Sequence, residues 1–413
     1  MKLVRITTLY PRNLEGFYGK HQGMSKQSFR EQRSSLEYNA FGWADFWYNA
    51  LTPLGYEVME IILNAEPMQR AWARENSLRD PGGMDLKEIA LEQIKWFQPD
   101  ILWFDDLSED LLKHIRSEVP SIRLVLGWVG SAVPHSNIWQ HMDLILTCAP
   151  ESRDYLQAAG FRSKQIHHGF DPRINTRLKD NPKNIDVSFF GQIIRRNQFH
   201  LYREHFLEQL ASQIDIYIFS PNADFGWKDY VKTLLLQIIY EGCQMMKYIG
   251  FSESTLKALP IIDKVSQWTS KPRFPINRNL KKYIKPPVFG IEMYQVLRDS
   301  KISLNIHADS SPTYASNMRL FETTGVGTCL VTDWKENLHE LFEPGKEVVV
   351  YKTVSECVEK IMWLLEHPKE REEIAQAGMA RTLKEHTFAQ RAKQLDEIIR
   401  IEFEYENNGD VIN

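Results

Sequence analysis

The chain has 413 residues, of which 43% are hydrophobic and 25% are charged, and its formal net charge is −4. At about 100–200 residues per domain, this length predicts two or three domains with room for sizeable cores. The composition excludes a disordered, a collagen-like and a disulfide-stapled chain, and the slight acidity argues against a dedicated nucleic-acid-binding protein. No stretch reaches the about 18 consecutive apolar residues of a membrane-spanning helix.

The N-terminus alternates like a buried first strand and lacks the pattern of a signal peptide. The four cysteines, Cys148, Cys243, Cys329 and Cys357, are far apart and show neither a C-x-x-C motif nor zinc-ligand spacing. We interpret them as reduced side chains of the core. The expected location is therefore the cytoplasm.

Apolar runs alternate with amphipathic segments through the first half. The expected strands are Lys2–Tyr10, one that begins at Gly55, Asp100–Phe104, Arg123–Trp128, Leu144–Thr147 and Gln165–His168. The expected helices are Gly42–Leu54, Glu88–Phe97, Leu107–Val119 and Glu151–Ala159. Strands that alternate with helices predict a parallel sheet covered on both faces.

A polar stretch with Pro and Asn, Gly169–Asn184, is the expected linker, after which the same rhythm resumes. The expected strands are then Ile185–Gly191, Ile216–Phe219, Ile302–His307, Thr328–Thr332 and Glu347–Val350. The expected helices are Arg195–Gln213, Asn317–Gly325, Val354–Glu366, Glu370–His386 and Phe388–Glu404. The sequence thus predicts an α/β protein of two doubly wound halves.

Residues 224–286 interrupt this rhythm with an apolar, helix-like segment and then a basic, aromatic stretch. One interpretation is an insertion that docks on a membrane surface or an acceptor. The other is a helical subdomain that packs on the second half and exposes a solvated basic face. We prefer the second, because the basic residues fall in a Pro-containing loop.

Polar residues are densest in three neighbouring segments, Asn305–Asp309, Ser316–Glu322 and Gly325–Thr328. In order, these segments predict a strand, a loop, the start of a helix, a turn of small residues and another strand. Arg319 lies near the expected helix start, where backbone N–H groups favour an anion, and its guanidinium suits a diphosphate. Glu322, three residues later on the same face, suits ribose hydroxyls. The alternative is an ordinary i,i+3 ion pair, and spacing alone leaves both open.

Four segments resemble the glycosyltransferases related to the spore-maturation family, which are similar to the retaining family-four enzymes. They are Ser316–Glu322, Gly325–Asp333, Glu343–Glu347 and His386–Phe388. The resemblance is close over Val288–Leu395 and looser in the first half. It implies the GT-B fold, in which two Rossmann-like domains face a cleft.

This resemblance sets the expected domain organisation. We expect an acceptor-binding domain at residues 1–172 and a nucleotide-sugar-binding domain at 173–413, with a helical insertion at about 224–286. We also expect the C-terminal helix to pack back on the first domain. One position departs from the family-four pattern of two glutamates separated by seven residues, because Tyr314 stands where the first glutamate is expected.

The resemblance also implies a donor site. Arg319 is expected to contact the donor phosphates, Glu322 to hold the nucleotide ribose, and Asn317 to belong to the same motif. Gly191 would let a backbone N–H approach the phosphates, unless it only permits a tight turn.

Three further donor contacts are weaker expectations. Arg195 and Arg196 would neutralise diphosphate charge, or else remain two solvated charges. Gly290 would line the base pocket through its backbone.

The catalytic candidates besides Arg319 are His307, His21 and Asp45. His307 ends a buried strand and could bond the departing phosphate or the sugar, or could be a satisfied core histidine. His21, in the segment Glu15–His21 that we expect as a loop, and Asp45 could orient or deprotonate an acceptor hydroxyl, or could be structural. Asp105, Asp106 and His135 are further acceptor-side candidates that the sequence does not rank.

The expected function is transfer of a sugar from a nucleoside-diphosphate sugar to an acceptor hydroxyl, with retention of configuration. No metal or cofactor beyond this co-substrate is expected, since Asp-x-Asp, Walker and dinucleotide motifs are lacking. The acceptor, whether a glycan, a lipid-linked glycan, a protein or a small molecule, stays open, as does peripheral membrane contact. The alternatives are a nucleotide-sugar epimerase on the same fold and a non-catalytic protein that binds glycans or nucleotide sugars.

Overall fold

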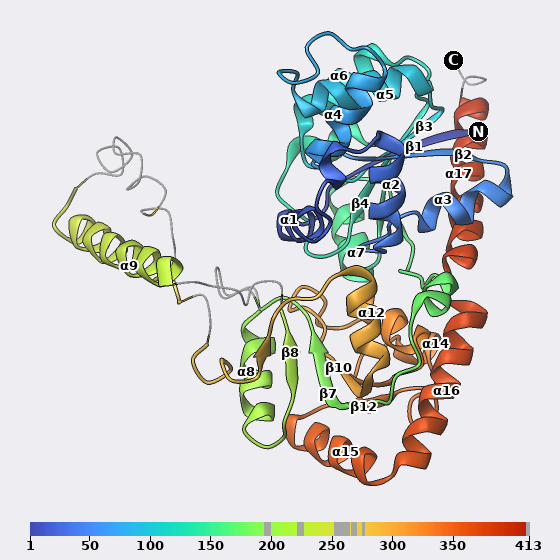
Figure 1. The fold of residues 1–413 in the computed structure, drawn as a ribbon. Coiled ribbons are helices and arrows are strands. Elements are labelled where there is room, and N and C mark those ends of the chain that lie inside the picture. Colours follow the sequence, from blue (N-terminus) through green and yellow to red (C-terminus); the bar gives the residue numbers. More distant parts are fainter. Residues whose placement is uncertain (194–199, 221–226, 252–264, 266–270, 275–276, 410–413) are drawn as a thin grey trace.

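Two α/β domains lie one above the other in the computed structural model, which describes residues 1–193, 200–220, 227–251, 265, 271–274 and 277–409 (Figure 1). Each domain is built on a six-stranded sheet in which neighbouring strands run parallel. Helices flank both sheets. The predicted fold, two doubly wound domains, is therefore confirmed.

The first sheet has the strand order β2-β1-β3-β4-β5-β6. Its strands are β1 Lys2–Thr7, β2 Glu57–Ile62, β3 Ile101–Phe104, β4 Leu124–Val129, β5 Leu144–Thr147 and β6 Ser163–Gln165. Except for the edge strand β6, Ser-Lys-Gln, they are short and mostly apolar, because a parallel sheet is buried on both faces. The order reverses between β1 and β3, and such a reversal opens a crevice at the carboxyl ends of the strands.

The helices of the first domain include three that the sequence analysis missed: α1, α2 and α4. The helices are α1 Pro11–Lys20, α2 Phe29–Tyr38, α3 Phe46–Leu51, α4 Glu66–Glu75, α5 Leu86–Phe97, α6 Glu109–Glu118 and α7 Pro150–Ala158. The expectation of a loop at Glu15–His21 was wrong, since Leu14 and Phe17 bury one face of α1. Signals were present, because Pro11 starts α1 and Ser28 with Glu31 forms a capping box at α2.

The second sheet has the order β12-β11-β10-β7-β8-β9. Its strands are β7 Ile185–Phe190, β8 Tyr217–Phe219, β9 Ile284–Lys285, β10 Ser300–Asn305, β11 Cys329–Asp333 and β12 Val349–Tyr351. The helices are α8 Leu201–Ala211, α9 Trp227–Tyr248, α12 Gly290–Arg298, α13 Arg319–Gly325, α14 Leu338–Leu341, α15 Val354–Glu366, α16 Pro368–Glu385 and α17 Phe388–Gly409. The strand expected at Ile302–His307 thus ends two residues earlier, at Asn305.

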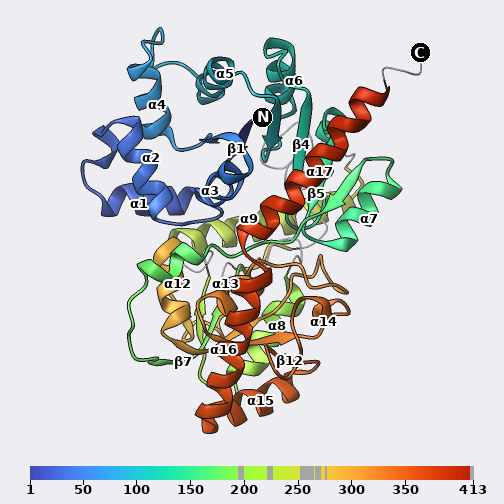
Figure 2. The ribbon, with the colours of Figure 1, turned by 90° about the vertical axis from the view of Figure 1, so that its right-hand side faces the viewer.

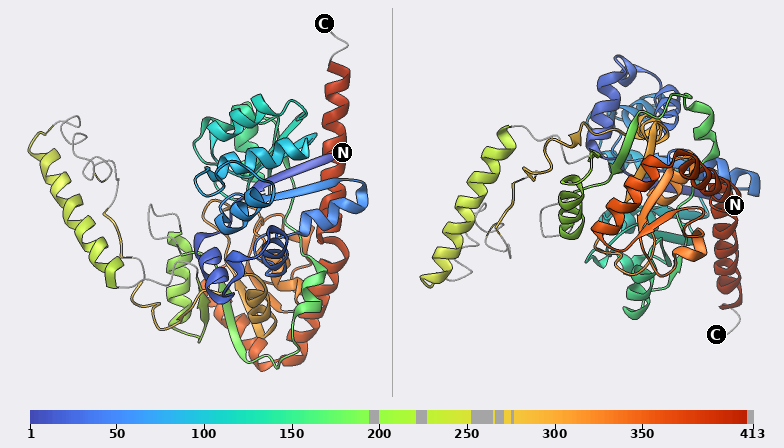
Figure 3. Two further views of the ribbon diagram at one scale, coloured as in Figure 1. Left: turned by 45° about the horizontal axis from the view of Figure 1, so that its top comes forward. Right: turned by 90° about the horizontal axis from the view of Figure 1, so that it is seen from below.

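The segment 224–286 differs from our preferred interpretation. Its helix α9 does not pack on the second domain but extends away from both domains (Figures 1 and 3). Most of its large apolar side chains are exposed. The end of the segment is not inserted at all, because β9 pairs with β8 at the edge of the second sheet.

The chain crosses between the domains near Phe170 and returns near Thr387, and the two crossings are bonded to each other. Phe170 N–H donates to the His386 carbonyl (2.8 Å), and Phe388 N–H donates to the Phe170 carbonyl (3.1 Å). Beyond this point α17 lies along the first domain (Figure 2), where Phe388 packs on Phe46 of α3. The boundary expected at residues 172 and 173 stays a prediction.

A single hydrophobic cluster continues across the two domains. It contains Trp47 and Trp103 from the first domain together with Phe321 and Phe342 from the second. At its centre, the Phe170 ring sits so close to Gly325 that a Cβ there would lie 2.4 Å from the ring. The domains are therefore packed on each other as well as tethered.

The four cysteines are free and buried, as expected for core side chains. In the part of the chain that the structure describes, no helix combines the length and apolarity needed to cross a bilayer.

Gly290 marks a close contact between the domains and gives a first prediction. Its φ is +54°, and a Cβ would lie 1.9 Å from the Asn39 carbonyl oxygen of the first domain, which accepts the Ile291 N–H (2.7 Å). We expect Gly290→Ala to lower the free energy of unfolding by about 1–3 kcal/mol beyond the strain of a positive φ, because the backbones must move apart.

Gly345→Ala is the matched control, since Gly345 also has a positive φ (+84°) but meets nothing within 4 Å of a built Cβ. Urea unfolding of both variants measures the difference. Equal losses of stability would contradict the role of Gly290 in the domain contact.

Candidate functional site

A cavity of about 360 Å³ lies between the two domains. Its walls include residues at or just beyond the carboxyl ends of β1, β3, β7 and β8: Thr7, Asp105, Gly191 and Phe219. Doubly wound sheets bind their ligands at these ends. The cavity is therefore the candidate site, and each predicted residue can be placed relative to it.

Arg319 and Glu322 lie together on the wall that the second domain contributes. Arg319 is the first residue of α13, and its Nη1 forms an ion pair with Glu322 Oε2 at 2.8 Å. The guanidinium also lies over the Phe190 ring, 5.2 Å from its centroid. The two interpretations of this pair are thus compatible, because the ion pair exists and both residues face the cavity.

The Arg319–Glu322 pair is largely shielded from solvent, with side-chain exposures of 14% and 4%. Tyr294 donates a hydrogen bond from its hydroxyl to Glu322 Oε1 (3.3 Å), and burial, followed by the Glu322 charge, raises the pKa of Tyr294 well above its usual value. The phenol therefore stays a donor. Arg319 Nε is buried and has no hydrogen-bond partner among the described residues, which leaves donor capacity on the guanidinium.

Gly191 also lines the cavity, directly after β7. A Cβ at this position would lie 2.8 Å from the Phe189 ring, so only glycine fits without displacement. However, its N–H donates to the Phe219 carbonyl (3.2 Å). The amide that we expected to face the donor phosphates is thus bonded within the domain in this structure.

Of the other expected donor residues, the structure describes Gly290 and Asn317, and neither lines the cavity. Arg195 and Arg196 lie outside the described residues. Gly290 contacts Asn39 instead of lining the cavity. Asn317 lies nearby in sequence but donates from its side-chain amide to Asn305 Oδ1 (2.7 Å).

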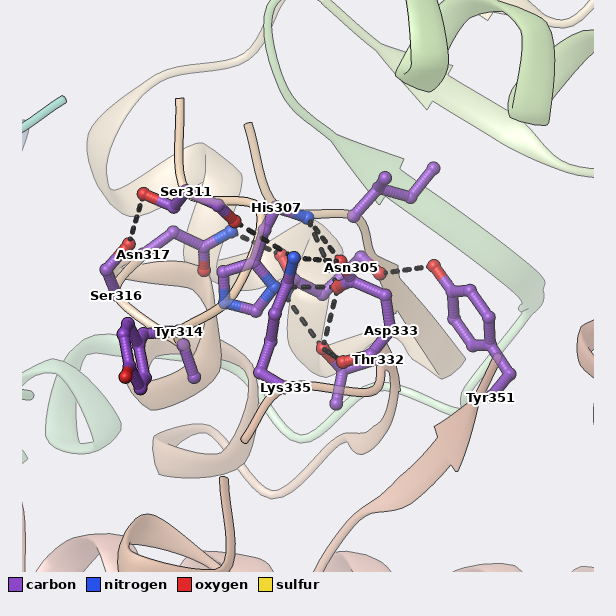
Figure 4. A network of polar contacts seen from close by, with 12 residues as sticks. Asn305, His307, Ser311, Tyr314, Ser316, Asn317, Thr332, Asp333, Lys335 and Tyr351 are labelled. Atoms are coloured by element: carbon purple, nitrogen blue, oxygen red, sulfur yellow. Dashed lines mark hydrogen bonds and ion pairs between the residues drawn. The ribbon is translucent and has the colours of Figure 1, made fainter. Parts of the chain in front are cut away.

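His307 belongs to a buried polar network of the second domain (Figure 4). Its Nδ1 lies 2.6 Å from Asp333 Oδ1, and Lys335 Nζ lies 3.4 Å from Asp333 Oδ2. Burial alone would raise the pKa of Asp333, but His307 and Lys335 lower it overall. The His307 side chain is fully buried and is not among the residues that line the cavity, as in the core-histidine alternative, but its Nε2 has no hydrogen-bond partner among the described residues.

Two acceptor-side candidates also lie away from this cavity. Asp45 accepts two hydrogen bonds from Arg173, at 2.9 Å each, and so ties α3 to the segment where the chain leaves the first domain. His21 lines a second cavity of about 590 Å³ between α1 and α12. An ion pair between Lys20 and Glu292 (2.6 Å) crosses from one domain to the other there.

The first domain contributes a charged cluster that the sequence analysis largely missed. The register of the sheet places Arg5 of β1 beside Glu60 of β2, and their side chains approach to 3.8 Å. Arg5 also contacts Asp105 (3.3 Å) and lies 4.6 Å from the centroid of the Trp43 ring. All four residues line the cavity. The sequence did contain a signal for this cluster, because Arg5 and Glu60 are each a charged residue in the middle of an otherwise apolar strand.

The carboxylates of this cluster are strongly perturbed by burial. Desolvation raises the pKa of Glu60 to about 7 and also raises that of Asp105, although Arg5 acts in the opposite direction on both. Arg5 Nε and Glu60 Oε1 are buried without a hydrogen-bond partner among the described residues. Buried polar atoms are normally paired, so these two are free to bond a ligand that enters the cavity. Asp106 and His135, the remaining candidates, do not line the cavity.

The raised pKa of Glu60 predicts a pH dependence of stability. Because the pKa of Glu60 in the folded protein lies above the ordinary glutamate value of 4.5, the folded protein holds this proton more tightly than the unfolded chain does. The resulting stability is complete below about pH 4.5 and is lost as the pH rises through about 7. Glutamine does not titrate in this range. We therefore expect the free energy of unfolding of Glu60→Gln to fall less between pH 5 and pH 8 than that of the wild type, by on the order of 2 kcal/mol.

Urea unfolding at pH 5 and pH 8 measures the effect. Glu57→Gln, on the exposed part of the same strand, is the matched control and should follow the wild type. A Glu60 variant with the same pH dependence as the wild type would contradict the assignment.

Comparison with known proteins adds to this geometry. Residues 195–397 match a family model described as glycosyl transferase-like. This part of the chain is similar to glycosyltransferases. It contains Arg319 and Glu322, whereas Arg5, Glu60 and Asp105 lie outside it. A search of curated proteins finds no match.

Solved structures of similar fold cover nearly the whole chain. The Anabaena protein HepE in complex with UDP-glucose is 14% identical, with a TM-score of 0.50 over 97% of this chain and 99% of that one. Sucrose-phosphate synthase from Thermosynechococcus elongatus is 10% identical, with a TM-score of 0.52 over 98% and 99%. An alpha-glucosyltransferase in complex with UDP-glucose and DNA is 12% identical, with a TM-score of 0.53 over 97% and 99%.

At these identities the likeness shows the fold, and it confirms the GT-B arrangement of two domains around a cleft. The resemblance to glycosyltransferases is confirmed for the second half at the level of the family model. The narrower relation to the spore-maturation and family-four enzymes stays a prediction.

Proposed function

We propose that the protein is a glycosyltransferase that moves a sugar from a nucleoside-diphosphate sugar to an acceptor hydroxyl. The observation that carries this proposal is the Arg319–Glu322 pair on the wall of the interdomain cavity, within the part of the chain that matches the glycosyl transferase-like model. A guanidinium suits a diphosphate, and a carboxylate suits the two hydroxyls of a ribose.

Two of the proteins of similar fold were solved with UDP-glucose, namely HepE and the alpha-glucosyltransferase. Their ligand supports a nucleoside-diphosphate sugar as the donor class. It also makes UDP the first nucleotide to test.

In the proposed reaction, the acceptor hydroxyl oxygen forms a bond to the anomeric carbon of the donor while the bond from that carbon to the diphosphate oxygen breaks, and the hydroxyl proton passes to the leaving diphosphate. Negative charge develops on the leaving diphosphate, and Arg319 stabilises it from a site that is largely closed to water. The carboxylates of Glu60 and Asp105 on the opposite wall accept hydrogen bonds from the acceptor. We include retention of configuration in the proposal on the strength of the sequence resemblance, and independence of metal ions because the sequence has no Asp-x-Asp motif.

Arg319→Ala tests the donor site. Removal of the guanidinium should weaken the binding of a nucleoside diphosphate more than about tenfold, since a charge-assisted contact contributes about 1.5–3 kcal/mol. Titration calorimetry with UDP, GDP, dTDP, ADP and CDP identifies the base and measures the loss.

Arg298→Ala is the control, because Arg298 is another arginine of the second domain whose ion pair, with Asp180, lies outside the cavity. It should bind the nucleotide as the wild type does. Unchanged affinity in the Arg319 variant would eliminate its phosphate role.

The transfer itself is tested by incubating the protein with sugars of the nucleoside diphosphate that binds best, together with a panel of acceptors. We expect release of nucleoside diphosphate that depends on an acceptor and persists in EDTA, with retention visible in the NMR spectrum of the product. Conversion of the donor without any acceptor would instead indicate an epimerase. Tight binding with no reaction for any acceptor would indicate a non-catalytic binding protein.

A further inference from the structure

Helix α9 is the part of the molecule whose apolar surface has no partner among the described residues of the two domains. It leaves the second domain after β8, and the chain returns to the sheet at β9. Figures 1 and 3 show the helix extending well clear of both domains. None of its residues lines the interdomain cavity.

Apart from Leu235 and Tyr248, which lie to either side, the exposed apolar side chains of α9 form one continuous stripe. They recur at the three- and four-residue spacing that aligns side chains on one helical face, and Gly242 fills the single gap. The apolar stripe consists of Trp227, Val231, Leu234, Ile238, Met245 and Ile249. Their exposed fractions lie between 45% and 72%. Ile249 continues the helix by one residue, since its N–H donates to the Met245 carbonyl (3.0 Å).

An exposed apolar surface of this length normally marks a site of interaction. By contrast, the opposite side of α9 is where its buried residues, Thr233 and Cys243, lie. The helix therefore has one covered side and one apolar side that faces solvent.

The segment that carries α9 is basic, although the chain as a whole is acidic. Residues 224–286 contain eleven Lys and Arg against five Asp and Glu, which gives this segment a charge of +6. Since the net charge of the chain is −4, the rest of the chain has a charge of −10. Lys228 and Lys232 are exposed on the helix itself. Glu241, the acidic residue beside the stripe, is paired with Lys271.

We propose that α9 docks this protein on an anionic lipid surface. An apolar helical face flanked by basic residues is the pattern of helices that lie in a membrane interface, and each Lys or Arg near such a surface contributes about 1 kcal/mol. Aromatic residues stand at both ends, Trp227 and the highly exposed Tyr248, and these residue types prefer the lipid–water boundary.

Charge distinguishes this partner from a second copy of the chain. Two such segments that met stripe to stripe would each bring a charge of +6, and the repulsion would oppose their association. An anionic bilayer offers the complementary charge and an apolar interior at once. The inference is independent of the proposed sugar transfer, because α9 contributes nothing to the cavity.

Co-sedimentation of the full-length protein with vesicles tests the inference. The vesicles contain either phosphatidylcholine alone or phosphatidylcholine with about one third phosphatidylglycerol, a fraction chosen to give a strongly anionic surface. We expect binding to the anionic vesicles to be at least about tenfold stronger and to weaken in high salt.

Ile238→Glu places a charge in the middle of the stripe and should reduce binding to anionic vesicles by about tenfold. Gln244→Glu is the matched control, because it adds the same charge at an exposed position of α9 outside the stripe. It should reduce binding less than about threefold, which is the effect of charge alone. Both positions are exposed, so the melting temperatures should equal that of the wild type.

Three results would overturn the proposal. The first is equal binding of the wild type to both kinds of vesicle, and the second is an equal effect of the two substitutions. The third is an Ile238 variant that changes from dimer to monomer in sedimentation velocity while its vesicle binding is unchanged. That last result would assign the stripe to self-association.

Discussion

The bonded crossing of the two chain segments between the domains is the constraint on which the remaining geometry depends. Phe170 exchanges backbone hydrogen bonds with His386 and Phe388, and Arg391 donates from Nε to the His168 carbonyl (2.9 Å). Because the outgoing and returning segments are joined here, α17 is directed along the first domain instead of away from it. The same contact holds the carboxyl ends of both sheets on either side of one cavity.

The two walls of that cavity have opposite chemical character. The second domain presents a guanidinium above an aromatic ring, with its countercharge one helical turn away. The first domain presents two carboxyl groups around a buried arginine, in an environment that favours their protonated forms. The wall of the second domain therefore favours an anionic group and the wall of the first domain favours a hydroxyl-rich group, so the cavity is electrostatically asymmetric before any ligand enters.

The sequence predicted most strands because they are apolar runs between polar or glycine-containing segments, but it missed the two-residue β9 and displaced β6, which has no apolar residue. It also found Arg319 and Glu322, whose partnership is local to one turn of α13. The Arg5–Glu60 contact could not be predicted in the same way, since it depends on a register between strands more than fifty residues apart. His307 looked equally suited to the cleft, but the strand ends at Asn305 and the imidazole turns to Asp333. Similarly, no local pattern predicts whether an amphipathic helix such as α9 packs on its own domain or extends away from it.

The bonded crossing also determines how such a molecule can move. It lies on one side of the domain pair, whereas the Lys20–Glu292 contact between α1 and α12 lies across the interface from it (Figure 2). A rotation about the crossing would keep the Phe170 bonds to His386 and Phe388, but it would break the Lys20–Glu292 contact and the Ile291–Asn39 backbone bond and would expose part of the shared hydrophobic cluster. Gln192 and Tyr10, whose side chains bond across the mouth of the cavity at 3.1 Å, separate in the same movement.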